Sequence, residues 1–282
     1  MNDIIFRGIA TGFRQWRIVA IVYALQLCLA LTLGMQAYEV LEASIGHSLE
    51  LHKLLQGYDH TVLTDFLNVH GASITPLLGQ LRWLALVWLF FSVFIQGGML
   101  YCAASAERIS GRAFWQGGAA YFLAFLPLAL FFLALALVWT AVLWLPAAAG
   151  LGWALEELPS EKYAVWGAVF LFFVWLSGLA VLFAWAALSR LHHIRRGGRF
   201  GGMIKNGFRA FWRDKTRCLG LLAAFGGIFL LLTLVYWTAG SYGGMTSPGM
   251  ILVFFGAQQA FVFARIALRQ MAYAALARIM AA

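Results

Sequence analysis

Six long apolar stretches constrain this chain more than any other feature of its sequence. Each reaches the roughly 17–25 residues that an α-helix needs to cross a bilayer. They cover residues 18–38, 83–104, 119–145, 163–188, 218–237 and 250–272. Because backbone N–H and C=O groups find no partner in lipid, each stretch must satisfy them internally as a helix. The sequence therefore predicts an all-α, polytopic membrane protein with about six transmembrane helices, in which residues 1–282 form a single membrane domain.

The composition suits lipid as the solvent. Of the 282 residues, 63% are hydrophobic and 11% are charged, whereas a soluble domain carries about 25% charged residues. The alternating segments of about ten residues that a β-barrel needs are absent. The first apolar stretch is longer than the h-region of a signal peptide, about 7–15 residues, so we expect it to be retained as a helix.

The basic residues predict the orientation. With the N-terminus in the cytoplasm, 17 of the 20 Lys and Arg residues fall on that side, and only Lys53, Arg82 and Lys162 fall outside. The positive-inside rule favours this arrangement, so both termini are predicted to be cytoplasmic. The same rule, with anionic phospholipids at the cytoplasmic face as partners, accounts for the net charge of +9. Nucleic acid is not an expected partner.

A basic and aromatic motif occurs three times, as GFRQWR at 12–17, GRAFWQ at 111–116 and GFRAFWR at 207–213. Each copy precedes a pair of apolar stretches, which predicts repeats over residues 1–104, 105–197 and 198–282. Each repeat would be a hairpin of transmembrane helices preceded by a basic-aromatic interfacial helix. The alternative is that any helix entry on the inner face attracts Trp and Arg. The expected interfacial anchors are Arg14, Trp16, Arg112, Trp115, Arg209 and Trp212.

These lead-in motifs and the paired stretches resemble bacterial multi-span proteins related to the membrane domain found with glycerophosphodiester phosphodiesterases. The resemblance is one of pattern and extends over the whole chain. It implies a fold type and a location in the bacterial inner membrane. It does not imply phosphodiester hydrolysis, because the chain has no room for the soluble catalytic domain.

One arginine lies well inside the last apolar stretch. Arg265 is 15 residues beyond Met250, about 22 Å along a helix, and Gln258, Val262 and Arg269 share its helix face. A polar stripe on a membrane helix usually faces the bundle or a wet cavity. Arg265, Arg269 and Gln258 are therefore candidates for an anionic lipid or ligand site. The alternative is an arginine that extends to the headgroups, beside glutamines bonded to other helices.

Other features of the stretches concern packing and turns. Gln26 and Gln96 are expected to hydrogen-bond to neighbouring helices. Gly71 and Pro76 are expected to end a short outer helix, and Pro127 to kink the third stretch. Small residues predict close helix contacts. They are Gly97, Gly98, Ser177, Gly178, Gly226, Gly227 and Gly256.

Patterns of known chemistry are missing. The apolar stretches contain no His, Asp or Glu, which disfavours a haem held by histidine or a carboxylate relay within the bilayer. The three cysteines form no C-x-x-C pair. His47 and Glu50 are three residues apart in the first outer loop, without a metal-binding motif. We therefore predict no catalytic residue, no metal and no cofactor.

Three functions remain open from the sequence. The first is a non-catalytic membrane subunit or scaffold that packs against protein partners and anionic lipids, favoured by the abundant interfacial anchors. The second is a transporter or lipid-handling protein with an anionic-ligand site near Arg265. The third is a subunit of a cofactor-containing membrane complex, which the absorbance of the purified protein would reveal.

Overall fold

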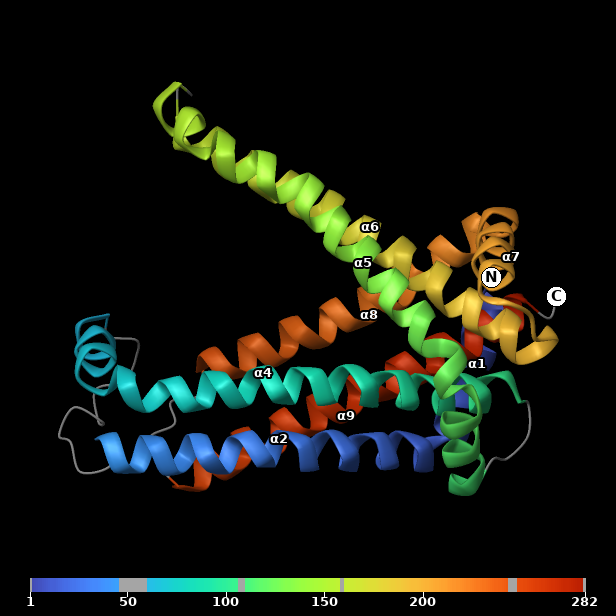
Figure 1. The fold of residues 1–282 in the computed structure, drawn as a ribbon, viewed down its shortest axis with the longest axis horizontal. Helices are drawn as coiled ribbons and strands as arrows, with labels where there is room; N and C mark the ends of the chain where they lie inside the picture. The colour runs from blue at the N-terminus through green and yellow to red at the C-terminus, as the bar shows by residue number, and fades with distance from the viewer. Residues whose placement is uncertain (1, 46–59, 106–109, 158–159, 243–247, 281–282) are drawn as a thin grey trace.

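The computed structural model describes residues 2–45, 60–105, 110–157, 160–242 and 248–280. All regular structure in these residues is helical (Figure 1). Six helices are long and apolar enough to cross a membrane, and they coincide with the six predicted stretches. The prediction of an all-α, multi-pass membrane protein is therefore confirmed. The helices are α1 (Asn2–Arg14), α2 (Trp16–Ile45), α4 (His60–Ala104), α5 (Gly111–Glu157), α6 (Glu161–Arg196), α7 (Phe200–Arg213), α8 (Lys215–Tyr242) and α9 (Pro248–Ile279).

Helices α4 and α5 are longer than the sequence pattern predicts. The prediction that Gly71 and Pro76 end a separate helix is wrong, because α4 runs through both residues. Helix α5 likewise continues through Pro127 and Pro146, and the kink expected at Pro127 stays a prediction. A proline removes one N–H from the helix ladder. The long helical runs on both sides of each proline keep their own hydrogen bonds, so each helix continues.

Two short helices, α1 and α7, lead into long helices through one linking residue each. Gln15 links α1 to α2, and Asp214 links α7 to α8. The Gln15 carbonyl accepts a hydrogen bond from the Ile18 N–H at 2.9 Å, and the Asp214 carbonyl accepts one from the Cys218 N–H at 2.9 Å. The chain therefore changes direction without losing the hydrogen bonds at the start of the next helix.

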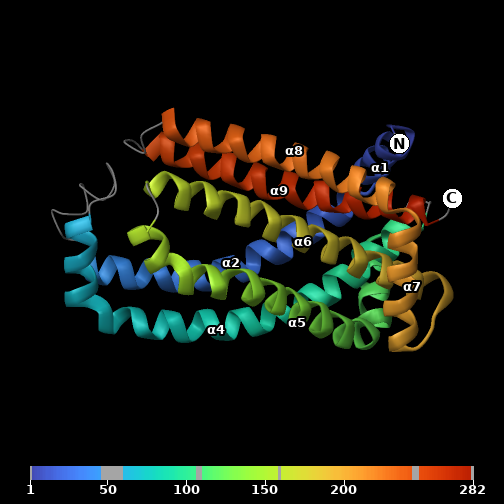
Figure 2. The same ribbon diagram turned by 90° about the horizontal axis from the view of Figure 1, so that it is seen from above.

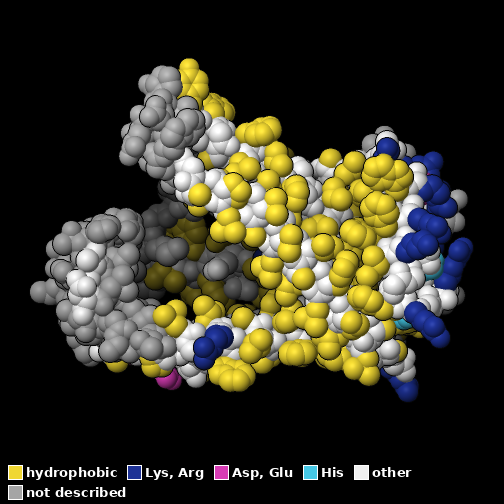
Figure 3. Space-filling view, turned by 45° about the horizontal axis from the view of Figure 1, so that its top comes forward, with side chains coloured by type: hydrophobic (Ala, Val, Ile, Leu, Met, Phe, Trp, Pro, Cys, Tyr) yellow, Lys and Arg dark blue, Asp and Glu magenta, His cyan; other side chains and the backbone are white. Residues whose placement is uncertain are grey.

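One end of the molecule collects most of the basic side chains, and we call it the basic end. It comprises α1, α7, the first turns of α5 and the last turns of α6 and α9. Figure 1 and Figure 2 place both termini there, and Figure 3 shows Lys and Arg gathered over it. At this end α1 packs on α9, where a Cβ added at Gly8 would lie 2.8 Å from the Cβ of Ala275. A glycine is therefore needed for this approach.

The turn between α6 and α7 depends on two glycines. Gly197 has φ +67° and Gly198 has φ +125°, a region of backbone conformation that residues with a Cβ rarely adopt. The Gly197 N–H donates to the carbonyl of His193 at 2.8 Å. This bond ends α6 and sends the chain back along the basic end as α7.

The packed core occupies the half of the bundle nearest the basic end. Its buried side chains come from the first turns of α2, α5 and α8, from the last turns of α4, α6 and α9, and from Phe211 of α7. Between Phe132 of α5 and Ala184 of α6, no described residue is buried. The outer halves of α5 and α6 diverge from α2 and α4 (Figure 1), and a hollow lies between them (Figure 3). The bundle is thus closed at one end and splayed at the other.

Closely approaching glycines hold α4 against α5. A Cβ added at Gly98 would lie 2.7 Å from the carbonyl oxygen of Phe114. A Cβ at Gly97 would lie 3.4 Å from the Cα of Gly118. The predicted packing role is confirmed for both α4 glycines and for Gly178. It is wrong for three others, where a Cβ would meet no described atom within 4 Å, namely Gly226, Gly227 and Gly256.

A buried amide network joins three segments inside the core. The side-chain NH2 of Gln270 in α9 donates to Gln15 Oε1 at 2.6 Å and to the Met99 carbonyl at 3.3 Å. Gln15 Nε2 in turn donates to the Cys102 carbonyl at 2.9 Å. Gln270 is fully buried and Gln15 nearly so. These bonds tie α9 and the α1–α2 link to the end of α4.

Replacing Gln270 with Leu is expected to lower the free energy of unfolding by about 1–3 kcal/mol, because two buried acceptors lose their donor. The thermal midpoint for loss of monodisperse protein in detergent measures this effect. Gln116→Leu is the control, because Gln116 is exposed on α5. Equal midpoints for the two variants would contradict the prediction.

Candidate functional site

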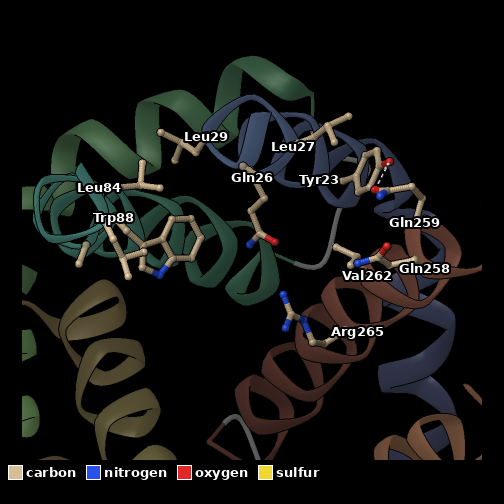
Figure 4. Close-up of a pocket in the computed structure, with 13 residues that line it drawn as sticks. Tyr23, Gln26, Leu27, Leu29, Leu84, Trp88, Gln258, Gln259, Val262 and Arg265 are labelled. Atoms are coloured by element: carbon tan, nitrogen blue, oxygen red, sulfur yellow. Dashed lines mark hydrogen bonds between the residues drawn. The ribbon is translucent and has the colours of Figure 1, made fainter. Parts of the chain in front are cut away.

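A cleft of about 440 Å³ opens where α2, α4 and α9 leave the packed core. Its lining residues follow the core residues of α2 and precede those of α4 and α9, so the cleft lies on the side of the core away from the basic end. Its wall is mostly apolar, and Figure 4 shows Leu84 and Trp88 of α4 facing Gln26 of α2. The lining residues are Tyr23, Gln26, Leu27, Leu29, Ala30, Leu81, Leu84, Ala85, Trp88, Gln258, Gln259, Val262 and Arg265.

Polar side chains gather on the α2 and α9 sides of this cleft. The Tyr23 hydroxyl donates to Gln259 Oε1 at 2.9 Å and so ties α2 to α9 (Figure 4). Gln26 from α2 and Arg265 from α9 point toward the same space (Figure 4). The predicted hydrogen bond between Gln26 and a neighbouring helix is absent from the described residues, and this amide faces the cleft instead.

Arg265 supplies the charge of the cleft. Within the described part of the chain its guanidinium forms no hydrogen bond and no ion pair. It lies 16 residues from Gly249 and 14 from Ile279, the limits of the last candidate span, which is about 24 Å and 21 Å along the helix. An unpaired arginine at the centre of a span costs roughly 2.5–3.5 kcal/mol. The cleft therefore combines an apolar wall with a positive charge that has no counter-ion in the described part of the chain.

Arg269 lies one helical turn nearer the basic end and outside the cleft. Its Nη2 donates to the sulfur of Met99 at 3.2 Å, and its guanidinium lies 5.8 Å from the centre of the Tyr273 ring. Its Nε is buried without a hydrogen-bond partner in the described residues. The structure thus brings Arg265 and Gln258 together in the cleft and separates Arg269 from them.

A second arginine lies in the packed half of the bundle. Arg190 of α6 is 7% exposed, and its guanidinium lies 6.0 Å from the centre of the Phe125 ring. Both guanidiniums contact side chains of the packed core, Arg190 at Phe125 and Arg269 at Met99. Among the described residues, its buried Nε has no hydrogen-bond partner and no carboxylate pairs with Arg190. Two positively charged side chains, Arg190 and Arg269, therefore lie in the packed half of the bundle.

Sequence reasoning missed Arg190, Gln15 and Gln270 as functional or structural polar groups. Arg190 falls directly after an apolar stretch and is counted there as one of many cytoplasmic charges. The sequence feature that could have identified it is its place, next to Ser189, within the otherwise apolar segment Ala184–Leu191. Gln270 lies inside an apolar stretch, which is the signal that could have identified it.

The six predicted anchors are all exposed and lie near the basic end. Trp16 and Trp212 do not occupy equivalent positions, because Trp16 begins α2 after the link and Trp212 lies within α7 before it. The predicted contact of these side chains with headgroups stays a prediction. Their exposed fractions are 57% for Trp16, 44% for Trp115 and 60% for Trp212.

Among the described residues, no three His, Cys, Asp or Glu side chains are grouped to hold a metal ion. His47 and Glu50, considered from the sequence, lie outside the described residues. No match was found when the chain was compared with protein-family models, curated proteins and solved structures.

Proposed function

We propose that this protein binds an anionic amphiphile in the cleft between α2, α4 and α9, and that it handles or transports such molecules in the membrane. The observation that carries the proposal is the unpaired guanidinium of Arg265 in an apolar cleft. A phosphate or carboxylate would accept two N–H bonds from this guanidinium. Apolar chains of the same molecule would lie against Leu27, Leu84 and Trp88 and continue into the lipid.

The size and polarity of the cleft support this assignment. Its volume of about 440 Å³ falls within the 300–1,000 Å³ that is typical of small-molecule sites. Gln26 and Gln258 add neutral donors and acceptors beside Arg265, which suits the ester and hydroxyl groups of a lipid headgroup. The cleft would take the headgroup and the first part of each chain.

Orientation and location belong to the same proposal. The basic end would face the cytoplasm of a bacterium, with α1 and α7 in the headgroup layer and the long helices paired as three hairpins. The guanidinium carbon of Arg17 lies 5.9 Å from the centre of the Trp16 ring. The ammonium nitrogen of Lys215 lies 4.7 Å from the centre of the Trp212 ring. An exposed aromatic ring beside a cation suits the membrane–water interface.

Replacing Arg265 with Ala is expected to weaken binding of phosphatidylglycerol about tenfold or more, because a charge-assisted hydrogen bond contributes roughly 1.5–3 kcal/mol. Native mass spectrometry of the detergent-purified protein, titrated with phosphatidylglycerol or with phosphatidylcholine, measures the effect. The parent should prefer the anionic lipid, and the Ala variant should lose that preference. Arg199→Ala is the control, because Arg199 is exposed and outside the cleft.

A second variant tests the cavity and not the charge. Ala30→Trp would fill the cleft while Arg265 remains, so it should reduce binding of both lipids. Ala134→Trp, on an exposed position of α5, should leave both unchanged. Equal phosphatidylglycerol binding by the parent, Arg265→Ala and Ala30→Trp would remove the basis for the proposal.

The scaffold function remains an alternative prediction and can be tested with the same variants. A scaffold would retain its co-purifying protein partner when Arg265 is replaced, since the partner would contact other surfaces. A lipid-handling protein would lose its anionic lipid in that variant. Mass spectrometry of proteins and lipids that co-purify with each variant separates the two functions.

A further inference from the structure

A second cavity lies at the basic end, between α6 and α7. It has a volume of about 470 Å³ and is separate from the cleft that holds Arg265. Met280, beyond the end of α9, forms one side of it. Four arginines line it, two from each helix: Arg195, Arg196, Arg209 and Arg213.

The positive charge of this cavity is only partly neutralised. Asp214 accepts a hydrogen bond from Arg213 Nε at 2.9 Å, and it also lies 3.6 Å from Arg217. Arg196 and Arg209 have no carboxylate partner among the described residues. Like charges around one cavity repel each other unless an anion lies between them. The cavity therefore has at least two guanidinium groups available for an anion.

The walls of this cavity are held in place by the packing of α7 on α6. Gly207 of α7 contacts Ser189 so closely that a Cβ at Gly207 would lie 2.6 Å from the Ser189 Cα. The indole N–H of Trp185 donates to the Ile204 carbonyl at 3.0 Å. Arg195 is itself oriented, because its Nη2 donates to the Ala277 carbonyl at 2.8 Å. The helix walls of the cavity and the Arg195 side chain are thus held in place by contacts within the protein.

Neutral donors and acceptors complete the lining. Asn206 and His192 face the same cavity, and Nδ1 of His192 is buried without a hydrogen-bond partner in the described residues. Guanidinium groups bind phosphate oxygens through paired N–H bonds. Several guanidiniums around one space suit a ligand with more than one phosphate charge, because each can take a different oxygen.

We propose that the cavity between α6 and α7 is a binding site for a group that carries two or more phosphate charges. Such a group occurs in a membrane lipid headgroup with two phosphates and in soluble diphosphates. The site lies at the basic end, within reach of both sources. It is independent of the amphiphile in the other cleft, so Arg265→Ala should leave it intact.

The test compares the parent with two double variants of equal net charge. Arg196→Gln with Arg209→Gln removes two guanidiniums from the cavity. Arg199→Gln with Lys205→Gln removes two exposed cations nearby that do not line it. The probes are inorganic pyrophosphate, by isothermal titration at low ionic strength, and cardiolipin, by native mass spectrometry against phosphatidylglycerol.

The parent and the Arg199/Lys205 variant should bind at least one probe equally well. The Arg196/Arg209 variant should bind it more weakly, by on the order of tenfold or more. Binding of pyrophosphate alone would identify a soluble ligand, and a cardiolipin preference alone would identify a lipid headgroup. Equal affinity in all three proteins, or no binding of either probe to the parent, would overturn the proposal. If the Arg196/Arg209 variant is not monodisperse, each single variant should still weaken binding several-fold.

Discussion

Leucine in place of Gly98 is expected to prevent stable packing of α4 against α5. A Cβ at this position would lie 2.6 Å from the Phe114 ring and 2.7 Å from its carbonyl oxygen. The ring can rotate away, but the carbonyl belongs to the helix backbone of α5 and cannot move alone. Excess volume in a packed core costs roughly 1–3 kcal/mol and sometimes more. Leucine adds four carbon atoms against a helix backbone, so we expect the loss of stability to reach or exceed the upper end of this range.

The measurement is the yield of monodisperse protein and its thermal midpoint in detergent. Gly227→Leu is the matched control, because it adds the same side chain to a transmembrane helix where a Cβ meets nothing within 4 Å. Helix association in lipid depends on close approach at small residues, so only the Gly98 variant should lose the bundle. Similar yields and midpoints for both variants would show that the α4–α5 contact is looser than described.

Methionine in place of Arg190 is expected to raise the thermal midpoint of the purified protein. The Arg190 guanidinium is buried and has no carboxylate partner in the described chain. It shares the packed half of the bundle with the like charge of Arg269, which contacts Met99. Its contact with Phe125 contributes about 0.5–2 kcal/mol, which is less than the several kcal/mol needed to bury an ion. Replacing buried charges with apolar side chains of similar volume is often neutral or stabilising by about 1–4 kcal/mol.

Two controls make the Arg190 prediction specific. Arg199→Met removes an exposed arginine and should change stability by less than about 0.5 kcal/mol. Arg190→Ala removes the same charge but leaves a cavity, so it should be less stable than Arg190→Met. A lower midpoint for Arg190→Met than for the parent would refute the expectation, since the guanidinium would then have a stabilising partner.

The residues of the candidate site show how far a local pattern reaches. The helical spacing of Gln258, Val262 and Arg265 placed these three on one face, and all three line the cleft. The same spacing grouped Arg269 with them, yet Arg269 contacts Met99 and Tyr273 in the packed half. Periodicity along a helix shows which face a residue occupies. It does not show where along that face the neighbouring helices diverge.

The amino-acid sequence by itself determined that this protein is a membrane protein, that it is all-helical, and where its six apolar spans lie. The reason is local, because an apolar run long enough to cross hydrocarbon must satisfy its own backbone hydrogen bonds. Only the tertiary structure decided that the core closes at the basic end and splays at the other, which creates the cleft at Arg265 and buries Arg190. These features depend on contacts between distant residues, such as Gly98 with Phe114 and Gln15 with Gln270, which no local pattern encodes.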